Sequence, residues 1–127
     1  MVGIGNIVRV ESMGGNQLIR EKAIVNTASI VTCWSNLTIG ASALIAPFCH
    51  ITDRNHGIEP GQRIFDQRGD IKPITIGDDV WIASSTTVLL GVSVGDGAIV
   101  DANSVVNKSI APGEIAAGSP VRTIGAR

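Results

Sequence analysis

The chain has 127 residues, of which 44% are hydrophobic and only 3% aromatic, and its formal net charge is −1. This length fits a single domain covering residues 1–127, and a nearly neutral chain without a basic run has no field that would attract nucleic acid or an anionic membrane. Because it has no apolar run near the roughly 20 residues of a membrane span and no signal-peptide pattern, we expect a cytoplasmic protein.

The first half of the chain carries aliphatic residues at intervals of six, beginning after residues 1–17, which follow no interpretable pattern. These residues are Leu18, Ile24, Ile30, Ile39, Ile45 and Ile51. The one irregular interval, nine residues between Ile30 and Ile39, predicts a three-residue bulge at residues 34–36. Small residues, Ala43 and Cys49, lie four places after an aliphatic one, as an inward position in a narrow core requires.

A polar segment, residues 57–73, interrupts this pattern. It is rich in Gly and Pro and has no six-residue order. A long irregular excursion from a regular scaffold is usually functional or mobile. We therefore expect a loop that projects from the repeat structure.

The six-residue interval is most regular in the second half of the chain. Its aliphatic positions are Ile76, Ile82, Val88, Val94, Val100 and Val106, and its small or β-branched positions, four places later, are Val80, Thr86, Val92, Ala98 and Ser104. Neither a helix of 3.6 residues per turn nor an alternating strand has this period. Two inward positions in six residues suit one short strand followed by one corner.

Three such hexapeptides would make one coil of a triangular prism. Residues 18 apart, such as Ile76 and Val94, would then pair on neighbouring coils about 4.8 Å apart. Gly91, Gly97 and Asn103 occupy the corner position, where positive φ favours Gly and Asn. The sequence thus predicts an all-β fold, a parallel β-helix with one long protruding loop, whose flat faces we expect other subunits to cover.

Only two histidines are available for acid–base chemistry, His50 and His56. Both occupy the same place in successive hexapeptides, which predicts positions near a corner. His56 lies where the regular coils meet the loop, a suitable place for a general base because one side is rigid. Asp53 could orient its imidazole. A contribution from His50 stays open.

Other site classes find little support in the sequence. Two histidines make a poor zinc constellation, so we expect no metal, and a zinc-dependent γ-type carbonic anhydrase is disfavoured. The chain has neither a nucleophile elbow nor a phosphate-binding loop. Cys33 and Cys49 form no CxxC pattern and are interpreted as reduced structural thiols.

The runs 74–83, 91–100 and 117–122 resemble the C-terminal half of hexapeptide-repeat acyltransferases. Within that family, residues 36–124 are most similar to the galactoside, maltose and polysaccharide O-acetyltransferases. The resemblance implies a left-handed β-helix, an exception to the right-handed crossover rule, and a homotrimer with active sites between subunits. It also implies acetyl-CoA as co-substrate and a sugar or polysaccharide precursor as acceptor.

The same resemblance assigns roles to particular residues. His56 would be the base, although Ile58 replaces a second histidine of the galactoside branch and Ala83 replaces a common glycine. The acyl-CoA site would comprise Trp81, Ala83, Ser84, Ala102, Lys108 and Arg122. The acceptor would be held by Asn36, Asp53 and Asn55.

The expected reaction is therefore transfer of an acetyl group to a hydroxyl, with backbone N–H groups stabilising the oxyanion. Two other functions stay open. One is N-acetylation of an amino sugar or an antibiotic. The other is a non-catalytic β-helix that binds a partner.

Overall fold

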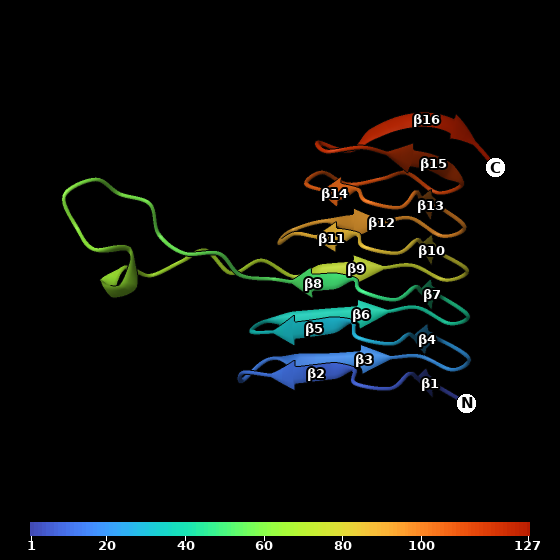
Figure 1. Ribbon diagram of the computed structural model, residues 1–127, viewed down its shortest axis with the longest axis horizontal. Coiled ribbons are helices and arrows are strands. Elements are labelled where there is room, and N and C mark those ends of the chain that lie inside the picture. The colour runs from blue at the N-terminus through green and yellow to red at the C-terminus, as the bar shows by residue number, and fades with distance from the viewer.

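A computed structural model describes all residues, 1–127, and contains sixteen strands and one short 3₁₀ helix. The strands wind into a stack of triangular coils, and a single long loop leaves the stack on one side (Figure 1). The N- and C-termini lie at opposite ends of the stack (Figure 1). The predicted parallel β-helix is confirmed.

Three sheets form the three faces of the prism. Face A contains β1 (Gly3–Ile4), β4 (Ile24–Val25), β7 (Leu44–Ile45), β10 (Trp81–Ile82), β13 (Ile99–Val100), β15 (Glu114–Ala117) and β16 (Arg122–Ala126). Face B contains β2 (Arg9–Ser12), β5 (Ile30–Cys33), β8 (His50–Thr52), β11 (Thr87–Val88) and β14 (Val105–Val106). Face C contains β3 (Asn16–Ile19), β6 (Asn36–Ile39), β9 (Ile74–Ile76) and β12 (Ser93–Val94). All pairings are parallel except β15 with β16, which is antiparallel and closes the C-terminal end.

The coils differ in length between the two halves of the chain. In the second half, Trp81 pairs with Ile99, 18 residues later, as three hexapeptides require. In the first half, Asn16 pairs with Asn36, 20 residues later. The extra residues lengthen the strands of faces B and C, which have four residues in β5 and β6 but two in β11 and β12.

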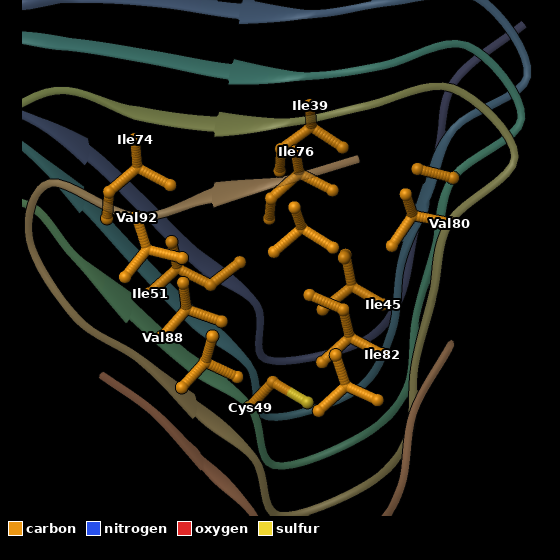
Figure 2. Packing of buried hydrophobic residues seen from close by; sticks show 14 of the residues in the cluster. Ile39, Ile45, Cys49, Ile51, Ile74, Ile76, Val80, Ile82, Val88 and Val92 are labelled. Atoms are coloured by element: carbon orange, nitrogen blue, oxygen red, sulfur yellow. The ribbon is translucent and has the colours of Figure 1, made fainter. Parts of the chain in front are cut away.

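The core is a narrow column of branched aliphatic and small side chains that point into the prism (Figure 2). Every aliphatic and small position predicted between Ile76 and Val106 is buried, with at most 2% of its surface exposed. Neighbouring coils stack like on like, as in Ile82 beside Val100. Burial of these apolar groups is the main driving force for the fold.

The corners between faces adopt left-handed backbone, as predicted. Gly91, Gly97 and Asn103 have φ of 76°, 70° and 57°. The same place in other hexapeptides is filled by residues such as Ser85, with φ of 58°. A sharp turn every six residues therefore imposes this conformation even on residues for which it costs energy.

Two details of the first half differ from the predictions. Leu18, Ile24 and Ile30 point outward and are exposed, because the inward residues are the ones that follow them, including Val25 and Val31. The expected bulge at residues 34–36 is also absent. Instead β5 continues to Cys33, and β6 begins at Asn36 after a tight turn.

The projecting loop begins at Asp53, earlier than predicted, and returns to the prism at Ile74, between faces B and C. Its root is a short antiparallel ribbon in which Arg54 bridges to Ile71. Its outer part holds η1 (Ile64–Asp66). This three-residue turn is the only helix, so no helix here has the length to cross a membrane.

Both cysteines are buried in the coils and unpaired. Burial raises the pKa of the Cys49 thiol above its ordinary value. Burial also raises the pKa of the Cys33 thiol, and the nearby Asp53 carboxylate raises it further. These properties agree with the expected structural role.

Candidate active site

His56 lies on the loop, immediately after the root ribbon, and its side chain is exposed. It borders a polar depression of about 190 Å³ formed by residues 55–59 together with 67, 68 and 70. Most of the lining is polar. An exposed imidazole beside a polar cavity can exchange a proton with a small hydroxyl compound.

The depression has a defined shape because side chains clamp the loop backbone. Gln67 Oε1 accepts a hydrogen bond from the Glu59 N–H at 2.8 Å, and its Nε2 donates to the carbonyls of Glu59 and Gln62 at 2.9 and 3.0 Å. Asn55 Oδ1 accepts from the Asp70 N–H at 2.8 Å. These bonds replace the ladder of a regular strand in holding the two sides of the loop together.

Gly69 allows the two strands of the root to touch. A Cβ at this position would lie 1.6 Å from the carbonyl oxygen of Asn55, so any larger residue would force the ribbon apart. The backbone next to His56 is thus fixed by close packing as well as by hydrogen bonds.

Asp53 does not face the depression, which corrects its predicted roles as an acceptor ligand and as the partner of the imidazole. Its side chain is fully buried. Its carboxylate accepts hydrogen bonds from the N–H groups of Trp34 and Ser35 at 2.8 and 2.7 Å and from the Ser35 hydroxyl at 2.9 Å. Asp53 is therefore an anchor that ties the start of the loop to the coil below it.

The other predicted acceptor residues lie close to the loop root. Asn55 borders the depression beside His56, although its Oδ1 is occupied by Asp70. Asn36 is exposed at the start of β6, one coil below, where its Oδ1 accepts a long 3.4 Å contact from Asn16. His50 begins β8 on face B, where it pairs with Ile30 and Thr87. It follows the corner residue Phe48 by two residues, close to a corner as predicted.

Several residues predicted to bind acyl-CoA gather at the corner between faces A and B. Ala83 and Ser84 follow β10, and Ala102 occupies the same corner one coil later. The Asn103 N–H donates to the Ser84 carbonyl at 3.0 Å, which locks these two coils together. Arg122 begins β16, after the turn that covers this corner.

Trp81 lies on face A with 48% of its surface exposed. It pairs with Leu44 below and Ile99 above, so three large apolar side chains form an outward row. A shallow pocket of about 240 Å³ borders this row. The surface is suited to an apolar ligand or to another chain.

Lys108 follows β14, at the corner between faces B and C, and not beside Arg122. This corner also carries the loop with His56, whereas Ser84 and Ala102 lie at the opposite end of face B. Within one chain, the predicted base and the predicted thioester site are therefore on different corners of the prism. No cluster of three or more His, Cys, Asp or Glu side chains occurs.

The sequence interpretation missed three residues at the loop root. Trp34, Arg54 and Arg68 come together beside the ribbon, with Arg54 stacked on the Trp34 ring. A possible signal was the position of Arg54 two residues before His56. Trp34 could not be linked to it, because the fold alone brings coil and loop together.

Comparison with known proteins places these features in context. A family model described as the hexapeptide repeat of succinyl-transferase matches residues 73–108. The galactoside O-acetyltransferase of Escherichia coli is 35% identical over 115 residues, which cover 89% of this chain and 55% of that protein.

Solved structures show the same fold over nearly the whole chain. A maltose O-acetyltransferase from Clostridium difficile superposes with a TM-score of 0.87 at 26% identity, covering 99% of this chain and 66% of its own. A hexapeptide-repeat acetyltransferase from Vibrio cholerae, complexed with acetyl coenzyme A, gives 0.80 at 26% identity, covering 96% and 69%. The chain spans about half the length of the curated relatives it matches.

Proposed function

Because the chain belongs to the hexapeptide-repeat acyltransferase family, we propose that it transfers an acetyl group from acetyl-CoA to a hydroxyl of a sugar or polysaccharide precursor. The observation that carries this proposal is the position of His56. It is the only histidine outside the regular coils, and it borders a polar depression large enough for part of a sugar.

In the proposed mechanism His56 is the general base. Its neutral imidazole takes the proton of the acceptor hydroxyl while that oxygen attacks the thioester carbonyl carbon. The carbon–oxygen bond forms, and the tetrahedral intermediate collapses by breaking the carbon–sulfur bond. The proton then passes from the imidazolium to the departing CoA thiolate, which leaves as the thiol.

The acetyl-CoA would lie along the corner between faces A and B. Ser84 and Ala102 present a column of small residues and backbone groups there, which leaves room for a narrow pantetheine chain. Trp81 would form one wall on face A, and Arg122 would neutralise phosphate charge, as would Lys108 contributed by another copy. Backbone N–H groups at the corner would stabilise the oxyanion.

The separation of the two corners requires this site to form between copies, and we propose a homotrimer. The loop of one copy would bring His56 to the A–B corner of its neighbour. Exposed apolar groups support the assembly. Leu44 and Trp81 on face A are about half exposed, and Ile64 and Phe65 on the loop are 58% and 92% exposed. A second copy that covered both regions would bury them.

The first test is His56→Ala, assayed by thiol release from acetyl-CoA with a panel of sugars and by mass spectrometry of the products. We expect kcat to fall by at least about 100-fold, because the variant loses its general base. Light scattering should still give the mass of three chains, and calorimetry should show unchanged CoA binding.

His50→Ala is the control, because it removes the other histidine, which is exposed on face B and does not line the depression. It should keep kcat within about twofold of the native value. Wild-type turnover by the His56→Ala variant would show that His56 is not the base. A native protein with no affinity for CoA would overturn the proposed function and favour a non-catalytic β-helix.

A further inference from the structure

A second cavity lies beside the loop root. It has a volume of about 270 Å³ and is lined by Trp34, Arg54, Arg68, Gly69 and Ile71. We call it the arginine pocket. Arg68 also lines the His56 depression, so the two cavities adjoin along this side chain.

The Arg54 side chain stacks on the Trp34 ring, but its Nε has no hydrogen-bond partner. Its guanidinium carbon lies 4.1 Å from the centre of the Trp34 ring, a favourable cation–π distance. Its Nε is buried and donates no hydrogen bond within the chain. This Nε has almost no accessible surface, so a ligand in the cavity would meet the guanidinium end of Arg54 instead, which lines the cavity.

The pocket also has an unbalanced charge. Neither Arg54 nor Arg68 forms an ion pair, whereas Arg9, Arg63 and Arg127 each have a carboxylate partner. No acidic side chain lines the cavity. The buried Asp53 is close in sequence, but its oxygens are occupied by Trp34 and Ser35.

We propose that the arginine pocket binds an anionic group, a carboxylate or a phosphate, carried by the acceptor saccharide. The guanidinium fork of arginine matches both groups with paired, charge-assisted hydrogen bonds. Because Arg68 borders both cavities, an acceptor held here by its acidic group places a neighbouring hydroxyl toward His56. The inference rests on the proposed function for the identity of the ligand as the acceptor.

Binding is tested by calorimetry at low ionic strength, in the absence of acetyl-CoA. The probes are methyl β-glucuronide, glucose 1-phosphate and the neutral methyl β-glucoside. We expect at least one acidic probe to bind at least about tenfold tighter than the neutral one, and the tighter of the two identifies the group. Arg68→Gln should abolish this preference, and Arg54→Gln should do the same.

Arg63→Gln is the control, because it removes the same charge from the same loop at an arginine that is paired with Asp66 outside the pocket. It should keep the preference. Arg68 is exposed, so its replacement leaves the proposal testable even if Arg54→Gln fails to fold. The proposal would be wrong if the native protein bound acidic and neutral probes with equal affinity. It would also be wrong if Arg63→Gln lost the preference for the acidic probe as fully as Arg68→Gln.

Acetyl transfer separates this proposal from the proposed function. If an acidic probe binds through Arg68 but no acceptor is acetylated, the pocket stands and the acyltransferase function is wrong. If acidic sugars are acetylated through His56 and the arginine variants change neither KM nor kcat for them, the function stands and the pocket is wrong.

Discussion

The stacked coils and the projecting loop are stabilised in different ways. In the coils, backbone hydrogen bonds join each strand to the next coil, and residues such as Ile82 are completely buried. In the loop, side chains of Asn55 and Gln67 hold the backbone, and Phe65 has 92% of its surface exposed. The coils supply the stability, whereas the loop supplies the candidate base.

This division makes the root of the loop the important joint of the molecule. A projecting segment can position His56 only if its attachment to the coils is rigid. The buried Asp53 carboxylate and the close passage of Gly69 beside Asn55 provide that rigidity. The same joint contains the arginine pocket, so positioning and recognition would share one structural element.

The largest difference in unfolding free energy is expected between truncation of a large apolar residue in the core and truncation of one on the loop. Ile82→Ala should lower the free energy of unfolding by about 2–5 kcal/mol, because it removes buried surface and leaves a cavity. Phe65→Ala should change it by less than about 0.5 kcal/mol in the isolated chain, because the ring is exposed. Urea unfolding of each variant measures both values.

The oligomeric state is a second measurement that separates the loop residue from the core residue. If the loop packs against a neighbouring copy, Phe65→Ala should shift the assembly toward single chains in light scattering at low protein concentration. A loss of chain stability in Phe65→Ala as large as that in Ile82→Ala would contradict the proposed division between coils and loop.

A smaller effect is expected at the joint itself. Asp53→Ala leaves the part-buried N–H groups of Trp34 and Ser35 without their acceptor, which should cost up to about 3 kcal/mol of unfolding free energy. It should also loosen the loop root, so that limited proteolysis cuts residues 54–72 faster than in the native protein.

Asp66→Ala is the matched control, because it removes an exposed carboxylate of the same loop. It should leave stability within about 0.5 kcal/mol of the native value and leave the cleavage rate of the root unchanged. Equal proteolysis of the two variants would show that Asp53 does not anchor the loop.

Sequence reasoning succeeded where one physical constraint dominated. Between Ile76 and Val106 every sixth residue is aliphatic and buried, so the period reveals the coils. In the first half, Ile39, Ile45 and Ile51 are buried as predicted. At the first three positions, adjacent apolar residues such as Ile24 and Val25 leave the inward position undecided by pattern, and the prediction was wrong by one residue. Packing between coils decides which of the two residues points inward. This packing exists only in the folded chain, so the sequence pattern could not reveal it.

The candidate site shows the same limit. His56 could be placed at the junction of coil and loop because the period stops there. The burial of Asp53 could not be predicted, since its donors Trp34 and Ser35 precede it by 18 to 19 residues and meet it only across coils. For the same reason the sequence could not show that His56 and Ser84 lie on different corners.

The smallest effect is expected from the thiols of Cys33 and Cys49, which are both buried in the coils. Burial raises the pKa of each thiol in the folded chain. The unfolded chain therefore loses these protons at lower pH than the folded chain does. Their stabilising effect is fully present below the ordinary thiol pKa, about 8.5, and is lost as pH rises above it.

Above that pH, the free energy of unfolding should fall by up to about 1.4 kcal/mol per thiol for each pH unit. The chain has no tyrosine, which removes one other group that titrates in this range. Urea unfolding between pH 8 and about pH 10 measures the slope. A variant with Cys33→Val and Cys49→Ala should show a flatter slope, and equal slopes would mean that the thiols are accessible to solvent in the folded coils.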